Sequence, residues 1–392
     1  MTPPPSVSAI VVSHGRPQHL ALCLSALCRQ RHPRYEIIVV ADTPPRWPDS
    51  DVPTQFHRFT ARNISTARNL GLAQARGEVV AFIDDDAVPE YDWLDQITAP
   101  FAHPRVGSAG GWVRGARGWA WQSKTILVDP EGWDRDLTHS AQQPIIVPAM
   151  PSGVLKTTGT NCAFRTQPLR AIGGFDPGFA YFLEETDVNM RLAQAGWLSV
   201  STPLAEVHHA TAPGPHRTTL RVPRSLVEIG GSRGRFLAKH CPDRAFDRHL
   251  KRFSEDQTLR LDRFVALGLL EGAQRDQLLE QFQSAMAEGF QSDLSPLAPL
   301  DGPSATGVPL RERPTSPRHL LKTGDPALAC DLVAAGAEVT RLSIGVWSLT
   351  KPKIGYSAAE GWHHRFPLTP TGRRLFQQEI ARLTPRRGPW VT

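Results

Sequence analysis

Short apolar runs and segments of helical periodicity alternate in the first part of the chain. The runs at residues 8–13, 36–40 and 79–83 have the length and branching of strands buried on both faces. Residues 18–31 carry leucines at helical spacing, and residues 64–75 are predicted to form a second helix. Strand, helix and strand in this order, without hairpin turns, predict right-handed β-α-β units of a parallel sheet and so an α/β fold.

The third of these strands ends in three consecutive aspartates, Asp84, Asp85 and Asp86. Adjacent carboxylates repel one another, so a cation beside them would stabilise the arrangement. A divalent metal such as Mg²⁺ or Mn²⁺ takes carboxylate oxygens and leaves other positions to water and substrate phosphates. The same residues also fit an acidic turn in which Asp86 caps a helix begun by Pro89. The triplet alone leaves both interpretations open.

A further acidic residue, Asp42, directly follows the second predicted strand. Asp42 and the aspartate triplet therefore lie at the carboxyl ends of strands in one sheet. Open α/β sheets bind their ligands at this edge, and we expect the ligand to be a nucleotide.

Composition and length point to several domains. The chain has 392 residues, of which 40% are hydrophobic and 21% charged, enough for two or three globular domains. We predict an α/β domain at 6–212, a basic helical extension at 213–291, a Pro/Ser/Gly-rich linker at 292–317 and a small α+β module at 318–392. The elements predicted in this module, whose role the sequence does not assign, are a helix at 327–335, a strand at 339–349 and a helix at 371–383.

The chain shows no targeting or membrane signal. Its start lacks a charged segment followed by an apolar block, and no run approaches the roughly 18 apolar residues of a membrane span. Five cysteines without C-x-x-C spacing fit a reducing compartment and no zinc site. We expect a cytoplasmic protein that has no nucleic-acid partner.

Charge is distributed unevenly. Residues 1–212 carry 18 Lys and Arg against 20 Asp and Glu, whereas residues 213–392 carry 26 against 18. Within the basic part, residues 243–270 have the pattern of an amphipathic helix. Such a surface can dock peripherally on the anionic inner face of the plasma membrane, or it can pack as a solvated helix on the first domain.

A series of short motifs carries a resemblance to a known family. They lie at residues 11–17, 67–71 (Ala-Arg-Asn-Leu-Gly), 82–89, 159–161, 173–176, 182–192 and 207–209. In this order they resemble the motifs of the family 2 glycosyltransferases, which have the GT-A fold, and the resemblance covers residues 6–212. It implies a Rossmann-like, mostly parallel sheet with flanking helices.

The resemblance also implies roles for individual residues. Nucleotide-sugar binding falls to Ser13, Asp42, Arg68, Asp84, Asp85 and Asn161. The metal, Mn²⁺ or Mg²⁺, falls to Asp86 and His208, with the adjacent His209 as the alternative. The catalytic group comprises Glu185, as the base for the acceptor hydroxyl, with Glu184 and Asp187. These three acidic residues also fit a purely structural role at the positive N-terminus of their helix.

The sequence departs from the family pattern at two positions. The family usually has two acidic residues after the second strand, whereas this chain has Ala41 and Asp42. The identity of the nucleotide base in the donor is therefore left open. The catalytic pair is usually Glu-Asp, and Glu185 adds one methylene group to its second member.

Four tryptophans lie between the predicted sheet motifs: Trp112, Trp119, Trp121 and Trp133. Flat aromatic rings line sugar-binding surfaces, because they pack against the C–H faces of sugars. Core packing is the competing explanation for at least half of them.

We therefore expect an inverting, metal-dependent glycosyltransferase that uses a nucleotide-diphosphate sugar donor. Its acceptor would be a glycan or a lipid-linked hydroxyl in cell-surface polysaccharide synthesis. A nucleotidyltransferase that makes sugar nucleotides is one alternative, but the turn at residues 13–17 is a poor version of its glycine-rich phosphate loop. A non-catalytic protein that binds a glycan or a partner is the other.

Overall fold

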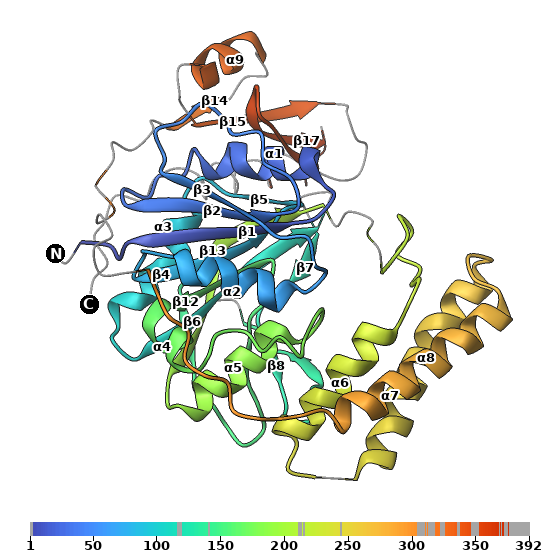
Figure 1. The fold of residues 1–392 in the computed structure, drawn as a ribbon. Coiled ribbons are helices and arrows are strands. Elements are labelled where there is room, and N and C mark those ends of the chain that lie inside the picture. The colour runs from blue at the N-terminus through green and yellow to red at the C-terminus, as the bar shows by residue number, and fades with distance from the viewer. Residues whose placement is uncertain are drawn as a thin grey trace.

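The computed structural model shows an α/β domain, a helical extension and a small C-terminal sheet module (Figure 1). The extension projects from one end of the α/β domain, and the module lies beside α1 at the other end (Figure 1). The structure describes residues 3–375 except 116–119, 140–141, 211–213, 215, 244, 304–309, 311, 313–317, 322–325, 335–337, 346–352, 368, 370 and 372–374.

A ten-stranded sheet forms the centre of the α/β domain, in the order β10-β13-β6-β12-β4-β1-β2-β3, with β5 beside β13 and β7 beside β6. Strands β4, β1, β2 and β3 are parallel to one another, and β12 is antiparallel to β4 and β6. The strands are β1 (Val7–Ser13), β2 (Tyr35–Ala41), β3 (Thr54–Arg58), β4 (Val79–Asp84), β5 (Ala87–Pro89), β6 (Val106–Gly115), β7 (Trp121–Ser123), β10 (Ile145–Val147), β12 (Asn161–Arg165) and β13 (Leu198–His209). The expectation of an α/β fold built on a mostly parallel sheet is confirmed.

Helices cover both faces of this sheet. Their bounds are α1 (Pro17–Leu27), α2 (Ile64–Gln74), α3 (Trp93–Thr98), the 3₁₀ helix η1 (Ala99–Ala102), α4 (Thr166–Ala171) and α5 (Glu184–Gln194). Alternate strand residues face opposite ways, so that Val11 joins the core with α1 and α3, and Ile10 joins the core with α2, α4 and α5. The three strands and two helices predicted first are all present.

The segment after the aspartate triplet is a strand and not a helix. Residues Ala87–Pro89 form β5, which pairs antiparallel with the end of β13 through His209↔Ala87 and His208↔Val88. The backbone oxygen of Asp86 accepts a hydrogen bond from the N–H of Ala210. The interpretation of Asp86 as the cap of a helix begun by Pro89 is therefore wrong, because long-range pairing with β13 takes these residues.

A small antiparallel sheet lies next to the N-terminal end of the helical extension. It has the order β11-β8-β9 and contains β8 (Ile126–Val128), β9 (Asp134–Asp136) and β11 (Val154–Lys156). Its Val128 and Val154 pack with Phe179 and Met190 against Phe236 of the extension.

The helical extension consists of α6 (Val227–His240), α7 (Phe246–Ala266) and α8 (Gly272–Phe290). Helices α6 and α8 lie so close that a Cβ atom at Gly234 would lie 1.9 Å from the backbone oxygen of Met286. Two basic side chains of α6 hold the extension to the α/β domain, since Arg235 and Lys239 both bind Asp176. Part of the predicted basic surface is therefore used for internal ion pairs.

The described part of the predicted linker packs along the α/β domain. The N–H of Leu300 donates to the backbone oxygen of Arg170, and the Leu300 side chain packs on one of the two main cores. The module that follows is a four-stranded sheet in the order β14-β15-β17-β16. Its elements are β14 (Arg318–Leu321), α9 (Pro326–Ala334), β15 (Glu338–Gly345), β16 (Lys353–Ser357) and β17 (Gly361–Pro367), and the helix predicted at 371–383 lies outside the continuously described residues.

The C-terminal module packs directly on the α/β domain. Ile354 and Trp362 form an apolar cluster with Ala26 of α1 and Val88 of β5. Arg29 donates to the hydroxyl oxygen of Tyr356 at 2.9 Å. None of the helices in the described ranges combines the length and apolar character of a membrane span.

Candidate active site

A pocket opens at the carboxyl ends of β1 and β4, beside the end of β13 and the start of α2. Acidic, basic and aromatic side chains share its wall. The lining residues used below are Ser13, Arg16, Arg62, Asp84, Asp85, Asp86, Tyr181, His209, His216 and Arg217. The predicted edge of the sheet is thus the edge at which a binding pocket forms.

The three aspartates make different contacts. Asp84 accepts a hydrogen bond from the hydroxyl of Thr160 at 2.6 Å, and about a third of its side chain is exposed. Asp85 is buried and accepts from Ser13 Oγ at 2.6 Å and from Arg16 Nη1 at 3.0 Å. Burial raises the pKa of Asp85 to about 7, although Arg16 and Ser13 act in the opposite direction. Asp85 is thus held at the wall of the pocket by Ser13 of β1 and by Arg16 in the turn that follows.

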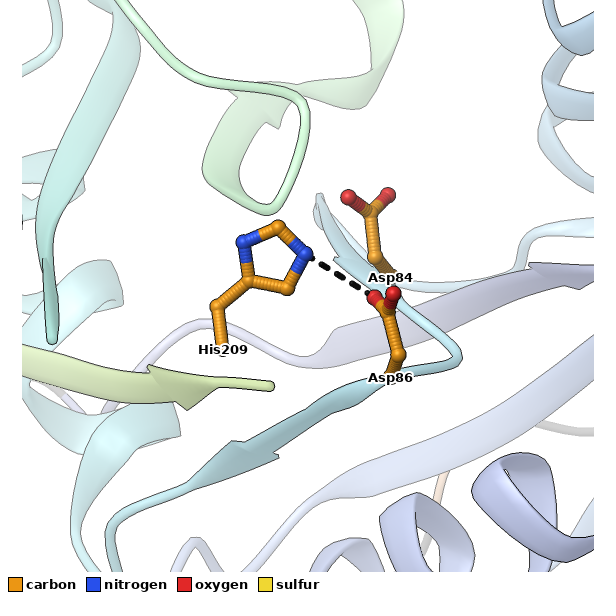
Figure 2. Close-up of side chains that lie close together, drawn as sticks. All are labelled: Asp84, Asp86 and His209. Carbon is orange, nitrogen blue, oxygen red and sulfur yellow. Dashed lines mark ion pairs between the residues drawn. The ribbon is translucent and has the colours of Figure 1, made fainter. Parts of the chain in front are cut away.

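Asp86 and Asp84 face His209 across a small space (Figure 2). His209 Nε2 lies 3.0 Å from Asp86 Oδ1, and one ligand atom from each of the three residues lies within 4.8 Å of the others. Gln122 Oε1 lies 3.1 Å from His209 Nδ1, which orients the ring so that Nε2 points to Asp86. Two carboxylates and one imidazole are a donor set that fits Mn²⁺, and the carboxylates also fit Mg²⁺.

The structure corrects the predicted metal histidine. Consecutive residues of a strand point to opposite faces, so only one of the two adjacent histidines of β13 can face the pocket. His208 points the other way, with Nε2 3.0 Å from Glu90 Oε1 and its ring 4.4 Å from that of Trp362. Burial lowers the pKa of His208, which favours the neutral ring. The histidine beside the aspartates is His209.

Arg68 lies beneath the pocket and connects its two sides. Its Nη1 donates to Glu184 Oε1 at 2.8 Å, and its Nη2 lies 3.7 Å from Asp84 Oδ1. The guanidinium is 2% exposed and packs over the rings of Phe82 and Phe175. Arg68 therefore positions two carboxylates, whereas we expected it to face the phosphates.

Glu185 has an unusual electrostatic environment at the start of α5. Burial, with the neighbouring Glu184 adding to it, raises the pKa of Glu185 to about 8. Glu184 itself is bound by Arg68 on one oxygen, while its Oε2 is buried without a hydrogen-bond partner among the described residues. A carboxyl with a pKa near neutrality is suited to proton transfer.

Asp187 has a structural environment in place of the predicted catalytic one. Its Oδ1 lies 2.8 Å from both Lys239 and His240 of α6, and its Oδ2 accepts from Arg191. Burial would raise the pKa of Asp187, but Arg191, the hydrogen bond with His240 and Lys239 together hold it well below its usual range. Asp187 thus joins α5 to the helical extension.

Two further predicted nucleotide-sugar residues also bind protein groups. Asn161 is fully buried, accepts from Trp93 Nε1 at 2.8 Å and donates to the backbone oxygens of Trp112 and Ala205. This corrects its predicted role, because the amide joins strands in the core. Asp42 accepts from the N–H of Gly15, which fixes the turn after β1, and it is partly exposed at the sheet edge.

The pocket also contains cations that the sequence did not single out. Arg16 binds Asp85 and Asp86 together, and Arg62 and Arg217 line the same wall. The rings of Tyr181 and His216 stack with centroids 4.5 Å apart. Arg16 lies in the turn after β1, and this position in the sequence could have placed it at the ligand-binding edge. Arg62 and Arg217 lie in loops that only the folded chain brings together.

The four tryptophans separate into different environments. Trp133 stacks on Phe253 of α7, with centroids 4.3 Å apart, and packs beneath Arg252. Trp112 and Trp121 line a second pocket, and Trp119 lies outside the described residues.

Residues 8–173 match the family model "Glycosyl transferase family 2". These residues belong to that family, and the resemblance inferred from the motifs is confirmed over residues 8–173. The mostly parallel sheet with flanking helices is the arrangement that the GT-A resemblance implied. The family match favours glycosyl transfer over the nucleotidyltransferase alternative.

Curated relatives carry glycosyltransferase names. The chain is 26% identical over 191 residues to the pre-mycofactocin glycosyltransferase of Mycobacterium tuberculosis, covering 48% of this chain and 38% of the relative. It is 28% identical over 183 residues to the N-acetylglucosaminyl-diphospho-decaprenol L-rhamnosyltransferase of the same species, covering 38% and 59%. The chain thus spans less than two thirds of the length of either relative.

Among solved structures, the mannosyltransferase PcManGT of Pyrobaculum calidifontis in complex with GDP-Man and Mn²⁺ is similar, with a TM-score of 0.42 and 17% identity. The match covers 74% of this chain and 88% of that protein.

Proposed function

We propose that the protein is an inverting, metal-dependent glycosyltransferase that takes its sugar from a nucleotide-diphosphate donor. The observation that carries this proposal is the arrangement of Asp84, Asp86 and His209 around one small space in a pocket of a family 2 domain. Asp84 and Asp86 with His209 would hold Mn²⁺ or Mg²⁺, and the bound ion would neutralise charge on the departing diphosphate.

The donor diphosphate has a matching set of cations. Arg16, Arg62 and Arg217 line the pocket around the aspartates, and planar guanidinium groups bind phosphate oxygens in pairs. Asp42, directly after β2, is the acidic group available to bind the nucleotide base or the ribose of the donor. The stacked Tyr181 and His216 close the same wall.

Glu185 is the proposed base. The acceptor oxygen attacks the anomeric carbon from the face opposite the diphosphate, and its proton passes to the Glu185 carboxylate. The new carbon–oxygen bond forms as the bond to the diphosphate breaks, so a single displacement inverts the anomeric configuration. Burial, with Glu184 held beside it by Arg68, keeps the pKa of Glu185 high and so favours proton uptake at this position.

A lipid-linked acceptor is supported by the surface of the helical extension. Four leucines are strongly exposed near the end of α7 and before α6: Leu220, Leu259, Leu267 and Leu269. Each lies within three residues of a member of the apolar cluster that contains Val222, Leu261 and Leu270, and we call these four residues the leucine surface. Arg221 and Arg263 are exposed beside them. Leucines bordered by arginines fit a membrane surface with anionic lipids.

The proposal is tested by incubating the full chain with a panel of nucleotide-diphosphate sugars and Mn²⁺, and following donor loss by mass spectrometry. We expect slow hydrolysis of one donor, complete loss of it in excess chelator, and recovery with Mn²⁺ or Mg²⁺. Asp86→Ala should abolish hydrolysis while leaving the circular dichroism spectrum unchanged. Full hydrolysis in chelator would contradict the metal, and no hydrolysis or transfer with any donor would contradict the enzyme.

A further inference from the structure

A second pocket lies between β7 and the chain that follows β9. It is lined by the rings of Trp112 and Trp121 and by the polar side chains of Lys124, Asp136 and His139. The proposed donor and metal site does not use these groups.

This pocket combines two partly exposed indole rings with polar side chains around them. The ring centroids of Trp112 and Trp121 are 5.0 Å apart and the ring planes meet at 82°. The ring centroid of His139 lies 5.5 Å from that of Trp112. Both tryptophans are partly exposed. Lys124 Nζ lies 5.0 Å from the centre of one ring and 5.5 Å from the other. As an exposed side chain, Lys124 can move aside for an incoming group.

Trp133 provides a comparison within the same region. Its ring is covered by Phe253 and Arg252, so its role is to attach the small sheet to α7. The Trp121 ring is covered on one face by Arg114, whose guanidinium carbon lies 4.1 Å from the ring centre, and Trp112 and Trp121 contact each other at a steep angle. Trp112 Nε1 donates to Thr125 Oγ1 at 3.2 Å, and Arg114 packs over Trp121. The two planes are thus held in place while part of each remains open.

One residue connects this pocket to the proposed metal site. Gln122 of β7 lines the pocket, and its Oε1 is 3.1 Å from His209 Nδ1. His209 in turn faces Asp86. A group bound in this pocket would therefore lie beside Gln122, which itself contacts a proposed metal ligand.

We infer that this pocket binds a sugar ring of the acceptor. This inference rests on the proposed function, because a saccharide acceptor is one of the two acceptor classes that such an enzyme can use. The apolar C–H face of a sugar packs on indole rings, while its hydroxyls bond to carboxylate, ammonium and imidazole groups. Asp136, Lys124 and His139 supply those three groups. The substrate class is thus narrowed to an acceptor whose terminal unit is a sugar.

The test is binding of simple sugars in the absence of transfer. The full chain with Mg²⁺ is mixed with methyl glycosides of glucose, galactose, mannose, rhamnose and N-acetylglucosamine, and binding is followed by saturation-transfer NMR. We expect at least one glycoside to bind and Trp121→Ala to weaken it roughly tenfold, as loss of one aromatic contact predicts. Trp121→Phe should retain much of the binding. Trp133→Phe is the matched control and should leave it unchanged.

Donor hydrolysis is measured on the same samples, so the two proposals fail separately. Trp121→Ala should hydrolyse the donor at the rate of the unmodified protein. Donor hydrolysis without binding of any glycoside, or glycoside binding that Trp121→Ala does not weaken, would overturn the sugar pocket alone. Binding of tetramethylammonium in place of every glycoside would overturn it in favour of a cation site. Glycoside binding without hydrolysis of any donor would overturn the proposed transferase.

Discussion

Replacing Glu185 by glutamine tests the proposed base in two independent ways. Glutamine keeps the size of the side chain and cannot take up the acceptor proton. We expect donor binding to be retained and transfer to fall by roughly 100- to 10,000-fold, the usual contribution of a general base. If transfer continues at the original rate, the base is another group, and Glu184 is the nearest candidate.

The pH dependence follows from the raised pKa. With a pKa of about 8, about one Glu185 carboxyl in a hundred is ionised at pH 6, about half at pH 8 and about nine in ten at pH 9. Since the base must be ionised, kcat/KM for the acceptor should rise by roughly 100-fold from pH 6 to pH 9 and then level off. A flat profile would refute the assignment.

The same shift predicts a change in stability. Raising this pKa from 4.5 to about 8 makes the charged form less favourable in the folded protein by up to about 5 kcal/mol. The folded state then holds a proton that the unfolded chain releases, so stability is lost as pH rises from 4.5 through 8. Urea denaturation should therefore show Glu185→Gln equal to the unmodified protein near pH 4 and more stable at pH 9.

Asp85 needs a control of its own, because its pKa of about 7 lies within the pH range over which kcat/KM is expected to rise. It lies on the donor side, so donor binding must be measured at each pH by calorimetry. The rise in acceptor kcat/KM should persist in Asp85→Asn if Glu185 is responsible.

Three other predictions address the metal, the membrane and the helical extension. His209→Ala should weaken Mn²⁺ binding, measured by electron paramagnetic resonance, by more than the roughly 10- to 100-fold typical of a supporting residue. The matched His208→Ala keeps all three proposed ligands and should bind Mn²⁺ more tightly than His209→Ala. The reverse order would return the ligand role to His208. Replacing Leu259 and Leu267 by serine should reduce sedimentation with anionic vesicles at low salt while donor hydrolysis continues, and equal sedimentation would leave the leucine surface without a membrane role. Asp187→Asn should destabilise the protein by about 3 to 5 kcal/mol at pH 7 in urea denaturation, because buried cations lose their partner. The difference in free energy of unfolding between the two proteins should shrink as pH falls below about 4. A carboxyl whose pKa is lowered by folding, such as Asp187, stabilises the folded state fully only above the ordinary carboxyl pKa. A difference that stays constant would contradict the ion-pair explanation.

The sheet and its ligand edge could be predicted from the sequence because buried parallel strands are continuous apolar runs. Val79 to Ile83 needs no tertiary information to be recognised as such a strand. β5 was missed because three residues, Ala87–Pro89, form a strand only by pairing with β13, more than a hundred residues later. Local turn chemistry at Asp86 left a helix open as an alternative, and long-range pairing with β13 excluded it.

Individual site residues were harder to predict than the site as a whole. The sequence places His208 and His209 side by side, and only the pairing of β13 decides which of them faces the aspartates. Asn161 lies within a matching motif, yet three partners distant in sequence bind its amide in the core. Gln122 carries no sequence signal, because its link to His209 exists only when β7 lies beside β6.

The position of β13 in the middle of the sheet affects how this protein can be divided. The family match ends at residue 173, whereas β13 lies between β10 and β6 and carries His209. A fragment cut to the matched residues would lose an interior strand, the acidic start of α5 and the imidazole of the proposed metal site in one step. The unit that evolution can transplant, or that a protein engineer can exchange between enzymes, therefore extends at least to His209. Because Trp362 packs on the opposite face of β13, even this longer piece would expose to water the apolar residues that Trp362 covers, such as Ala26 and Val88.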